Sequence, residues 1–96
     1  MNLSSPAIIK QLLSKYGTLP SKRMGQNFLV NRQTLEKIIK AADLRAEDII
    51  LEIGPGIGTL TQELAKNAKK VIAVEKDKYM CQILKETLKD YKNIEI

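Results

Sequence analysis

An apolar run that leads into a glycine-rich loop constrains this chain more than any other feature. Residues Ile49 to Ile53 are apolar except for Glu52, and glycines follow at positions 54, 56 and 58 before a helical pattern begins. Glycine lets the backbone approach a ligand at points where a Cβ atom would collide with it. A loop between a strand and a helix is also where open α/β sheets bind nucleotides. The pattern therefore predicts an α/β fold with a ligand site at this loop, although the glycines could also serve only to make a tight turn.

A carboxylate at the end of the next strand adds to this prediction. The apolar segment Val71 to Val74 is followed by Glu75, which lies 21 residues after Gly54. A carboxylate in this position can accept hydrogen bonds from both hydroxyls of a ribose. We therefore expect Glu75 to hold the ribose of a nucleoside-containing ligand.

The spacing of the glycines separates the nucleotide-binding classes. The dinucleotide fingerprint G-x-G-x-x-G requires glycine or alanine where this chain has Thr59, and residues 57–61 lack the lysine of a P-loop. The remaining pattern, E-x-G-x-G-x-G followed by an acidic strand end, is typical of the S-adenosylmethionine loop of methyltransferases. An NAD-dependent oxidoreductase remains a weaker alternative.

The composition excludes several kinds of site. Cys81 is the only cysteine and the chain has no histidine, so the sequence contains neither an internal disulfide nor a cysteine- or histidine-based metal centre or catalytic triad. We expect Cys81 to be a packing residue rather than a reactive thiol. No run approaches the length of a membrane span, and no secretory signal is recognisable at the start. We accordingly expect a cytoplasmic protein without a membrane or metal partner.

The positive charge is concentrated in the first part of the chain. Residues 1–40 contain seven basic residues and one acid, whereas residues 41–96 contain nine basic and ten acidic residues. A basic arm on a nearly neutral nucleotide-binding domain favours a polyanionic partner such as RNA or DNA. Scattered lysines that only solvate the surface would give the same count.

Hydrophobic periodicity predicts the order of the elements. Ser5 and Pro6 are typical of a helix start, Gly17 of its end, and Asn31 of the N-cap of a second helix. From residue 49 the pattern predicts strand, helix, strand, helix and strand, with parallel strands and short links. The apolar stripes expected on the last two helices comprise Leu60, Leu64, Ala65 and Ala68, and then Met80, Ile83, Leu84 and Leu88. Because the chain ends within the third strand, we expect it to be the N-terminal part of a longer protein.

Three segments together carry a resemblance to a known family. The segment Gly25-Gln26-Asn27-Phe28-Leu29, the loop from Leu51 to Thr61 and the run Val74-Glu75-Lys76-Asp77 together resemble the ribosomal RNA adenine N6,N6-dimethyltransferase family over residues 20–96. Pro55 and the pair Leu60-Thr61 resemble the branch that modifies small-subunit ribosomal RNA.

The resemblance implies a fold, a cofactor and a set of site residues. The fold would be the Rossmann-like fold of class I S-adenosylmethionine-dependent methyltransferases, of which residues 47–96 supply the first β-α-β-α-β half and residues 1–46 a basic helical arm. Cofactor-binding residues would be Asn27, Leu29, Gly54, Gly56 and Glu75, with the segment around Asn27 folded over the methionine end. The family's catalytic Asn-Leu-Pro-Tyr-like motif has no counterpart here, so no catalytic residue is named.

Three functions stay open at this point. The first is dimethylation of adenine N6 in small-subunit ribosomal RNA during ribosome biogenesis. The second is the large-subunit methylation that confers macrolide resistance. The third is a non-catalytic RNA-binding or ribosome-assembly module that retains a nucleotide-binding fold.

Overall fold

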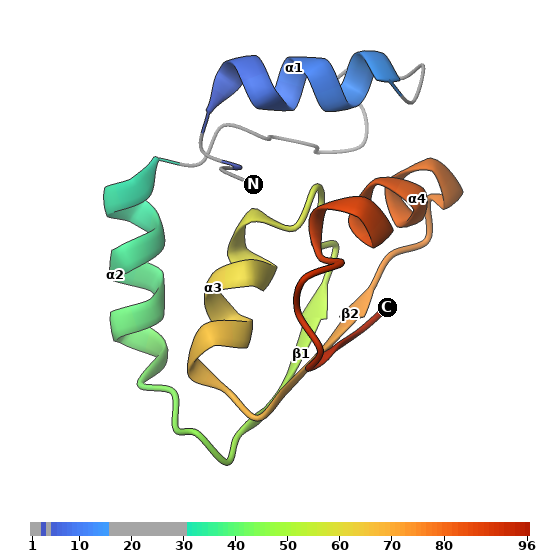
Figure 1. Cartoon of the computed structure of the whole chain (residues 1–96). Coiled ribbons are helices and arrows are strands. Elements are labelled where there is room, and N and C mark those ends of the chain that lie inside the picture. Colours follow the sequence, from blue (N-terminus) through green and yellow to red (C-terminus); the bar gives the residue numbers. More distant parts are fainter. Residues whose placement is uncertain (1–2, 4, 16–30) are drawn as a thin grey trace.

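A three-stranded parallel sheet forms the centre of the computed structural model, which describes residues 3, 5–15 and 31–96. The elements follow one another as α1 (Pro6–Lys15), α2 (Arg32–Ala42), β1 (Ile49–Ile53), α3 (Thr59–Asn67), β2 (Lys70–Val74), α4 (Lys78–Thr87) and β3 (Ile94–Glu95) (Figure 1). The predicted order and the parallel strands are confirmed. The second strand begins one residue earlier than expected.

The strands lie in the order β1-β2-β3, with β2 in the centre. Ile53 of β1 is paired with Val74 of β2, and Val71 of β2 is paired with Ile94 of β3. The two strands that lead to the glycine loop and to Glu75 therefore end side by side, as the prediction of a common site requires.

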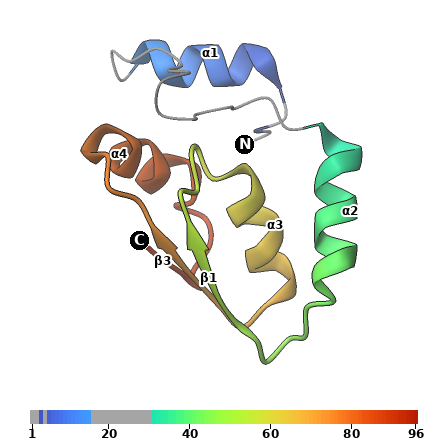
Figure 2. The same cartoon turned by 180° about the vertical axis from the view of Figure 1, so that it is seen from behind.

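One face of the sheet packs against helices. Val71 and Ala73 of β2 are buried, and Val71 forms a cluster with Leu64 and Ala65 of α3. Ile39 of α2 packs against the same cluster. The opposite face carries four large apolar side chains that are 48–71% exposed: Ile49, Leu51, Ile53 and Val74. Figure 2 shows the molecule from behind, in the direction opposite to that of Figure 1.

A second hydrophobic core brings α1 together with α4 and the glycine loop. Ile9 and Leu12 of α1 and the nearby Leu3 pack with Met80 and Ile83 of α4, and Ile57 of the glycine loop lies among them. Helix α1 therefore contacts the glycine loop and α4, which follow it in sequence by more than 40 residues. The N-terminal helix lies across this end of the molecule in both views (Figures 1 and 2).

The apolar stripes predicted for α3 and α4 agree with the observed burial to different extents. All four residues of the α4 stripe are buried. On α3, Leu64 and Ala65 are buried, but Leu60 is only half-buried and the polar residues Thr61 and Gln62 lie inside. The Gln62 side chain donates a hydrogen bond of 3.0 Å to the backbone carbonyl of Thr87 at the end of α4. This bond satisfies a buried amide and ties the two helices together.

Candidate cofactor site

The glycine loop uses backbone conformations that L-residues rarely adopt. Gly54, Gly56 and Gly58 have φ angles of +69°, +62° and +93°. Residues that have a Cβ atom incur a steric penalty at positive φ because Cβ approaches the following carbonyl oxygen. All three positions therefore favour glycine for conformational reasons alone.

Gly54 and Gly58 nevertheless have different surroundings. Among the described residues, a Cβ atom at Gly54 would meet no atom within 4 Å. A Cβ atom at Gly58 would lie 2.9 Å from Cδ2 of Leu88 and 3.2 Å from Cδ2 of Leu84. Gly54 thus faces open space where a ligand can approach, whereas Gly58 allows the loop to pack closely against α4.

Glu75 lies beside this loop. The backbone N–H of Gly54 donates a hydrogen bond of 3.0 Å to the carbonyl of Val74, which extends the pairing of β1 and β2 by one residue. Glu75 follows directly, is half-buried, and accepts a hydrogen bond of 3.1 Å at Oε2 from the backbone N–H of Asp77. That bond orients the carboxylate through the turn between β2 and α4, so the residues predicted for methionine and ribose contacts occupy adjacent strand ends.

The start of α4 holds this turn in place. Asp77 is the N-cap of α4 and accepts hydrogen bonds from the backbone N–H groups of Tyr79 at 2.9 Å and Met80 at 3.3 Å. The thiol of Cys81 lies 3.4 Å from the carbonyl of Glu75. Cys81 is half-buried and a free cysteine, and the structure contains no histidine that could activate it.

Glu52 places a second carboxylate under the loop. Its Oε1 accepts a hydrogen bond from the hydroxyl of Thr61, which is completely buried on α3. Burial raises the pKa of Glu52, and the hydrogen bond from Thr61 opposes this only in part. None of the ion pairs of the described residues involves Glu52. Partial burial of a carboxylate costs free energy, and a positively charged ligand group would offset this cost.

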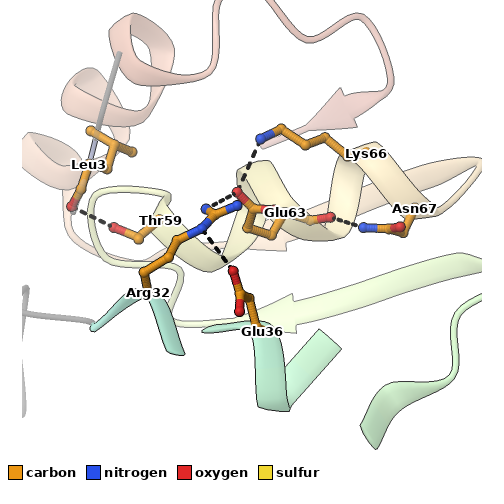
Figure 3. A network of polar contacts seen from close by, with 7 residues as sticks. All are labelled: Leu3, Arg32, Glu36, Thr59, Glu63, Lys66 and Asn67. Atoms are coloured by element: carbon orange, nitrogen blue, oxygen red, sulfur yellow. Dashed lines mark hydrogen bonds and ion pairs between the residues drawn. The ribbon is translucent and has the colours of Figure 1, made fainter. Parts of the chain in front are cut away.

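An ion-pair network fixes α2 against α3 (Figure 3). Arg32 Nη1 lies 2.7 Å from Glu63 Oε1, and Lys66 Nζ lies 3.1 Å from the same oxygen. Burial raises the pKa of Glu63, but the hydrogen bonds and charges of Arg32 and Lys66 outweigh it, so that the pKa is lowered overall. Asn31 caps α2 as predicted, because its side chain accepts a hydrogen bond of 3.1 Å from the N–H of Thr34.

Some predicted site residues lie outside the described part of the chain. Asn27 and Leu29 both belong to residues 16–30, as does the rest of the Gly25–Leu29 motif, so their roles remain predictions. Within residues 3, 5–15 and 31–96, no group of three or more acidic residues or cysteines could hold a metal ion. Over the same residues no helix has the length and apolar character needed to cross a membrane.

Sequence reasoning missed the residues that support the loop from behind. Ile57 occupies a variable position of the glycine pattern, yet its side chain is only 2% exposed and anchors the loop in the α1–α4 core. Its carbonyl accepts a hydrogen bond of 2.8 Å from the Thr87 hydroxyl. A single apolar residue between glycines was the only available signal, and it does not reveal which helix it contacts.

The family match covers most of the chain. Residues 18–96 match the family described as ribosomal RNA adenine dimethylase. Ribosomal RNA small subunit methyltransferase A from Alkaliphilus metalliredigens is 49% identical over 92 residues, which cover 96% of this chain and 32% of that protein. The methyltransferase of the same name from Leuconostoc mesenteroides is 44% identical over 96 residues, covering 100% of this chain and 32% of that protein. The chain thus spans about a third of the length of these curated relatives.

Solved structures show the same fold. A 23S rRNA methyltransferase, ErmE, superimposes with a TM-score of 0.68 at 43% identity, over 72% of this chain and 28% of that one. A dimethyladenosine transferase from Plasmodium falciparum gives a TM-score of 0.62 at 43% identity, over 68% of this chain and 25% of that one. Both superpositions confirm the predicted Rossmann-like methyltransferase fold.

Proposed function

The chain belongs to the ribosomal RNA adenine dimethylase family, and from this premise we propose that it forms the S-adenosylmethionine-binding part of an enzyme that dimethylates N6 of adenines in small-subunit ribosomal RNA. The enzyme would act in the cytoplasm during ribosome biogenesis. The relatives that match nearly the whole chain are named as small-subunit methyltransferases, which favours this substrate.

The main support for the proposal is that a glycine beside open space and a carboxylate lie at the ends of two neighbouring strands. No atom of residues 3, 5–15 and 31–96 lies within 4 Å of the position that a Cβ atom at Gly54 would take, and Glu75 lies at the end of the adjacent strand. Gly54 and Gly56 would let the methionine portion lie against the backbone, and Glu75 would accept hydrogen bonds from the ribose hydroxyls. Neither contact needs the lysine of a phosphate-binding loop, which this loop lacks.

Two further groups would act at the methionine end. Asn27 would bind through its amide and Leu29 through its backbone, as the resemblance implies. Glu52 is a half-buried carboxylate with a raised pKa, and the ammonium of the cofactor would supply a positive charge that no ion pair of the described residues provides. Thr61, which donates a hydrogen bond to Glu52, would hold that carboxylate in place.

The reaction requires two tasks of the protein: binding the methyl donor and orienting the adenine amine. S-adenosylmethionine supplies an electrophilic methyl group on a sulfonium. This chain's residues bind and orient the donor, which reduces the entropy that the reaction must lose. The exocyclic amine of adenine is a weak nucleophile because its lone pair is delocalised into the ring, and it needs hydrogen-bond acceptors that orient it. We assign no such acceptor, and hence no catalytic residue, to this chain.

Cofactor choice is tested by calorimetric titration of the chain with S-adenosylmethionine and, separately, with NAD. We expect heat of binding with the first ligand and none with the second. Binding of NAD in preference would refute the assignment and favour an oxidoreductase. The variant Gly54→Ala is the matched control for the site, since its Cβ enters the open space and should weaken binding.

The substrate is tested with a chimera in which this chain replaces the corresponding third of the Alkaliphilus metalliredigens relative. Labelled cofactor is incubated with under-methylated small and large ribosomal subunits, and the label in adenine is measured. We expect label in small-subunit RNA only. Label confined to large-subunit RNA would favour the second candidate, which the structural match to a 23S rRNA methyltransferase supports. Absence of label in both subunits would contradict the enzymatic proposal.

A further inference from the structure

A row of lysines lies on the outer side of α4. Lys78 and Lys85 are on the helix and Lys89 is in the turn that follows it, and all three are exposed. The positions at which α4 is buried, Met80, Ile83 and Leu84, alternate with them at helical spacing, so the lysines face away from the core. We call Lys78, Lys85 and Lys89 the lysine ridge.

The ridge has little negative charge to neutralise it. Within the described part of the chain, none of its three lysines takes part in an ion pair. Of the nearby acids, Asp77 caps the helix and Glu86 pairs with Lys15 of α1. Asp90 is exposed beside Lys89, and Glu75 is half-buried three residues before Lys78. The near-neutral charge of residues 41–96 therefore conceals a local excess of positive charge.

The ridge also starts at the candidate cofactor site. Lys78 follows the N-cap of α4, three residues after Glu75. Lys78 and Lys85 are seven residues apart in sequence, which corresponds to two turns, or about 10 Å, along a helix. One strand of a nucleic-acid duplex carries a phosphate about every 3.4 Å. The ridge can therefore face several successive phosphates of a strand that leads toward the site.

An exposed aromatic ring accompanies the first lysine. Tyr79 is 51% exposed, and Nζ of Lys78 lies 5.5 Å from the centre of its ring. Aromatic rings beside lysines are common where single-stranded nucleic acid is bound, because a base can stack on the ring while the lysine contacts the phosphate.

We propose that the lysine ridge is a contact surface for the phosphate backbone of the substrate RNA. This inference rests on the proposed function, because RNA is the polyanion that the family modifies. It adds a surface that the charge distribution along the sequence did not indicate, since the sequence count placed the basic excess in residues 1–40. In that arm, Lys15 and Arg32 are already engaged with Glu86 and Glu63.

The test compares two double variants that remove the same charge. Lys85→Gln/Lys89→Gln removes part of the ridge without touching the candidate cofactor residues. Arg45→Gln/Lys69→Gln removes two exposed charges near the amino ends of β1 and β2, at the opposite edge of the sheet from the glycine loop. Binding of each chain to a fluorescein-labelled RNA hairpin is followed by anisotropy at salt concentrations between about 50 and 200 mM.

We expect the slope of log affinity against log salt to become shallower by roughly 1.4–1.8 in the ridge variant, since each lost phosphate contact removes about 0.7–0.9. The control variant should retain the slope of the parent. Equal changes in both variants, or an unchanged slope in the ridge variant, would overturn the proposal. Competition by polyglutamate as effective as competition by unlabelled RNA would also overturn it, because it would indicate an acidic protein partner.

Calorimetry with S-adenosylmethionine separates this inference from the proposed function. The ridge variant should bind the cofactor as the parent does, which shows that it is folded. If the parent binds no cofactor but the ridge slope changes as expected, the ridge proposal stands and the proposed function fails. If the cofactor binds and the slopes do not differ, the ridge proposal alone fails.

Discussion

Gly58→Ala should destabilise the chain far more than Gly54→Ala, although both glycines have positive φ angles. At either position alanine incurs a backbone penalty of about 1–2 kcal/mol. At Gly58 the new Cβ would also lie 2.9 Å from Cδ2 of Leu88 and 3.2 Å from Cδ2 of Leu84, and such overpacking costs a further 1–3 kcal/mol or so. We therefore expect a loss of about 2–5 kcal/mol for Gly58→Ala, against about 1–2 kcal/mol for Gly54→Ala.

The assay is thermal unfolding followed by circular dichroism. In a domain of this size 1 kcal/mol shifts Tm by about 4–8 °C, so Gly58→Ala should lower Tm by at least roughly 8 °C. Adding Leu88→Ala to Gly58→Ala removes the nearest of the colliding atoms and, of the three nearest, leaves only Cδ2 of Leu84 at 3.2 Å, so the double variant should lose less stability than the sum of the two single losses. Additive losses, or equal Tm values for Gly54→Ala and Gly58→Ala, would refute the close approach of the loop to α4.

Variants at three other residues test the site and its supports. Glu75→Gln should weaken S-adenosylmethionine by on the order of tenfold in calorimetry, and Glu75→Ala by more, because charge-assisted hydrogen bonds to the ribose are lost; unchanged affinity in a folded variant would refute the ribose role. Asp77→Ala should cost about 1 kcal/mol in urea unfolding, since α4 loses its N-cap; no loss would contradict the capping geometry. Glu63→Gln should lower stability at neutral pH. Because Arg32 and Lys66 lower the pKa of Glu63, this difference should begin to shrink as the pH falls below the ordinary value of 4.5 and should vanish once the pH is below the lowered pKa and the parent carboxylate is protonated; a difference that persists in acid would contradict it.

The sequence predicted the features that depend on local pattern. The apolar run and the position of the glycines located β1 and the loop. Asn31 was recognisable as an N-cap because asparagine is a preferred capping residue, and in the structure its side chain accepts a hydrogen bond from the N–H of Thr34. The parallel order followed from the short helical links. These features depend on neighbouring residues, which a linear pattern contains.

Features that depend on distant residues could not be predicted in this way. The three glycines look equivalent in sequence, and only the packing of Leu84 and Leu88 against the loop separates Gly58 from Gly54. Thr61 and Gln62 are polar and were not expected inside, because their partners, Glu52 and the carbonyl of Thr87, belong to other elements. Charge counting along the chain likewise does not show which face of a helix its lysines occupy.

The core that α1 shares with α4 also determines when α1 can pack during synthesis of the chain. Leu12 and Ile83 belong to one cluster but are 71 residues apart in the sequence. At translation rates of about 5–20 residues per second, the ribosome needs roughly 4–14 seconds to synthesise the chain between them. A helix of ten residues is only marginally stable alone in water. During synthesis α1 therefore lacks its packing partners until α4 has emerged. Only after that can α1 pack against α4 and support the glycine loop.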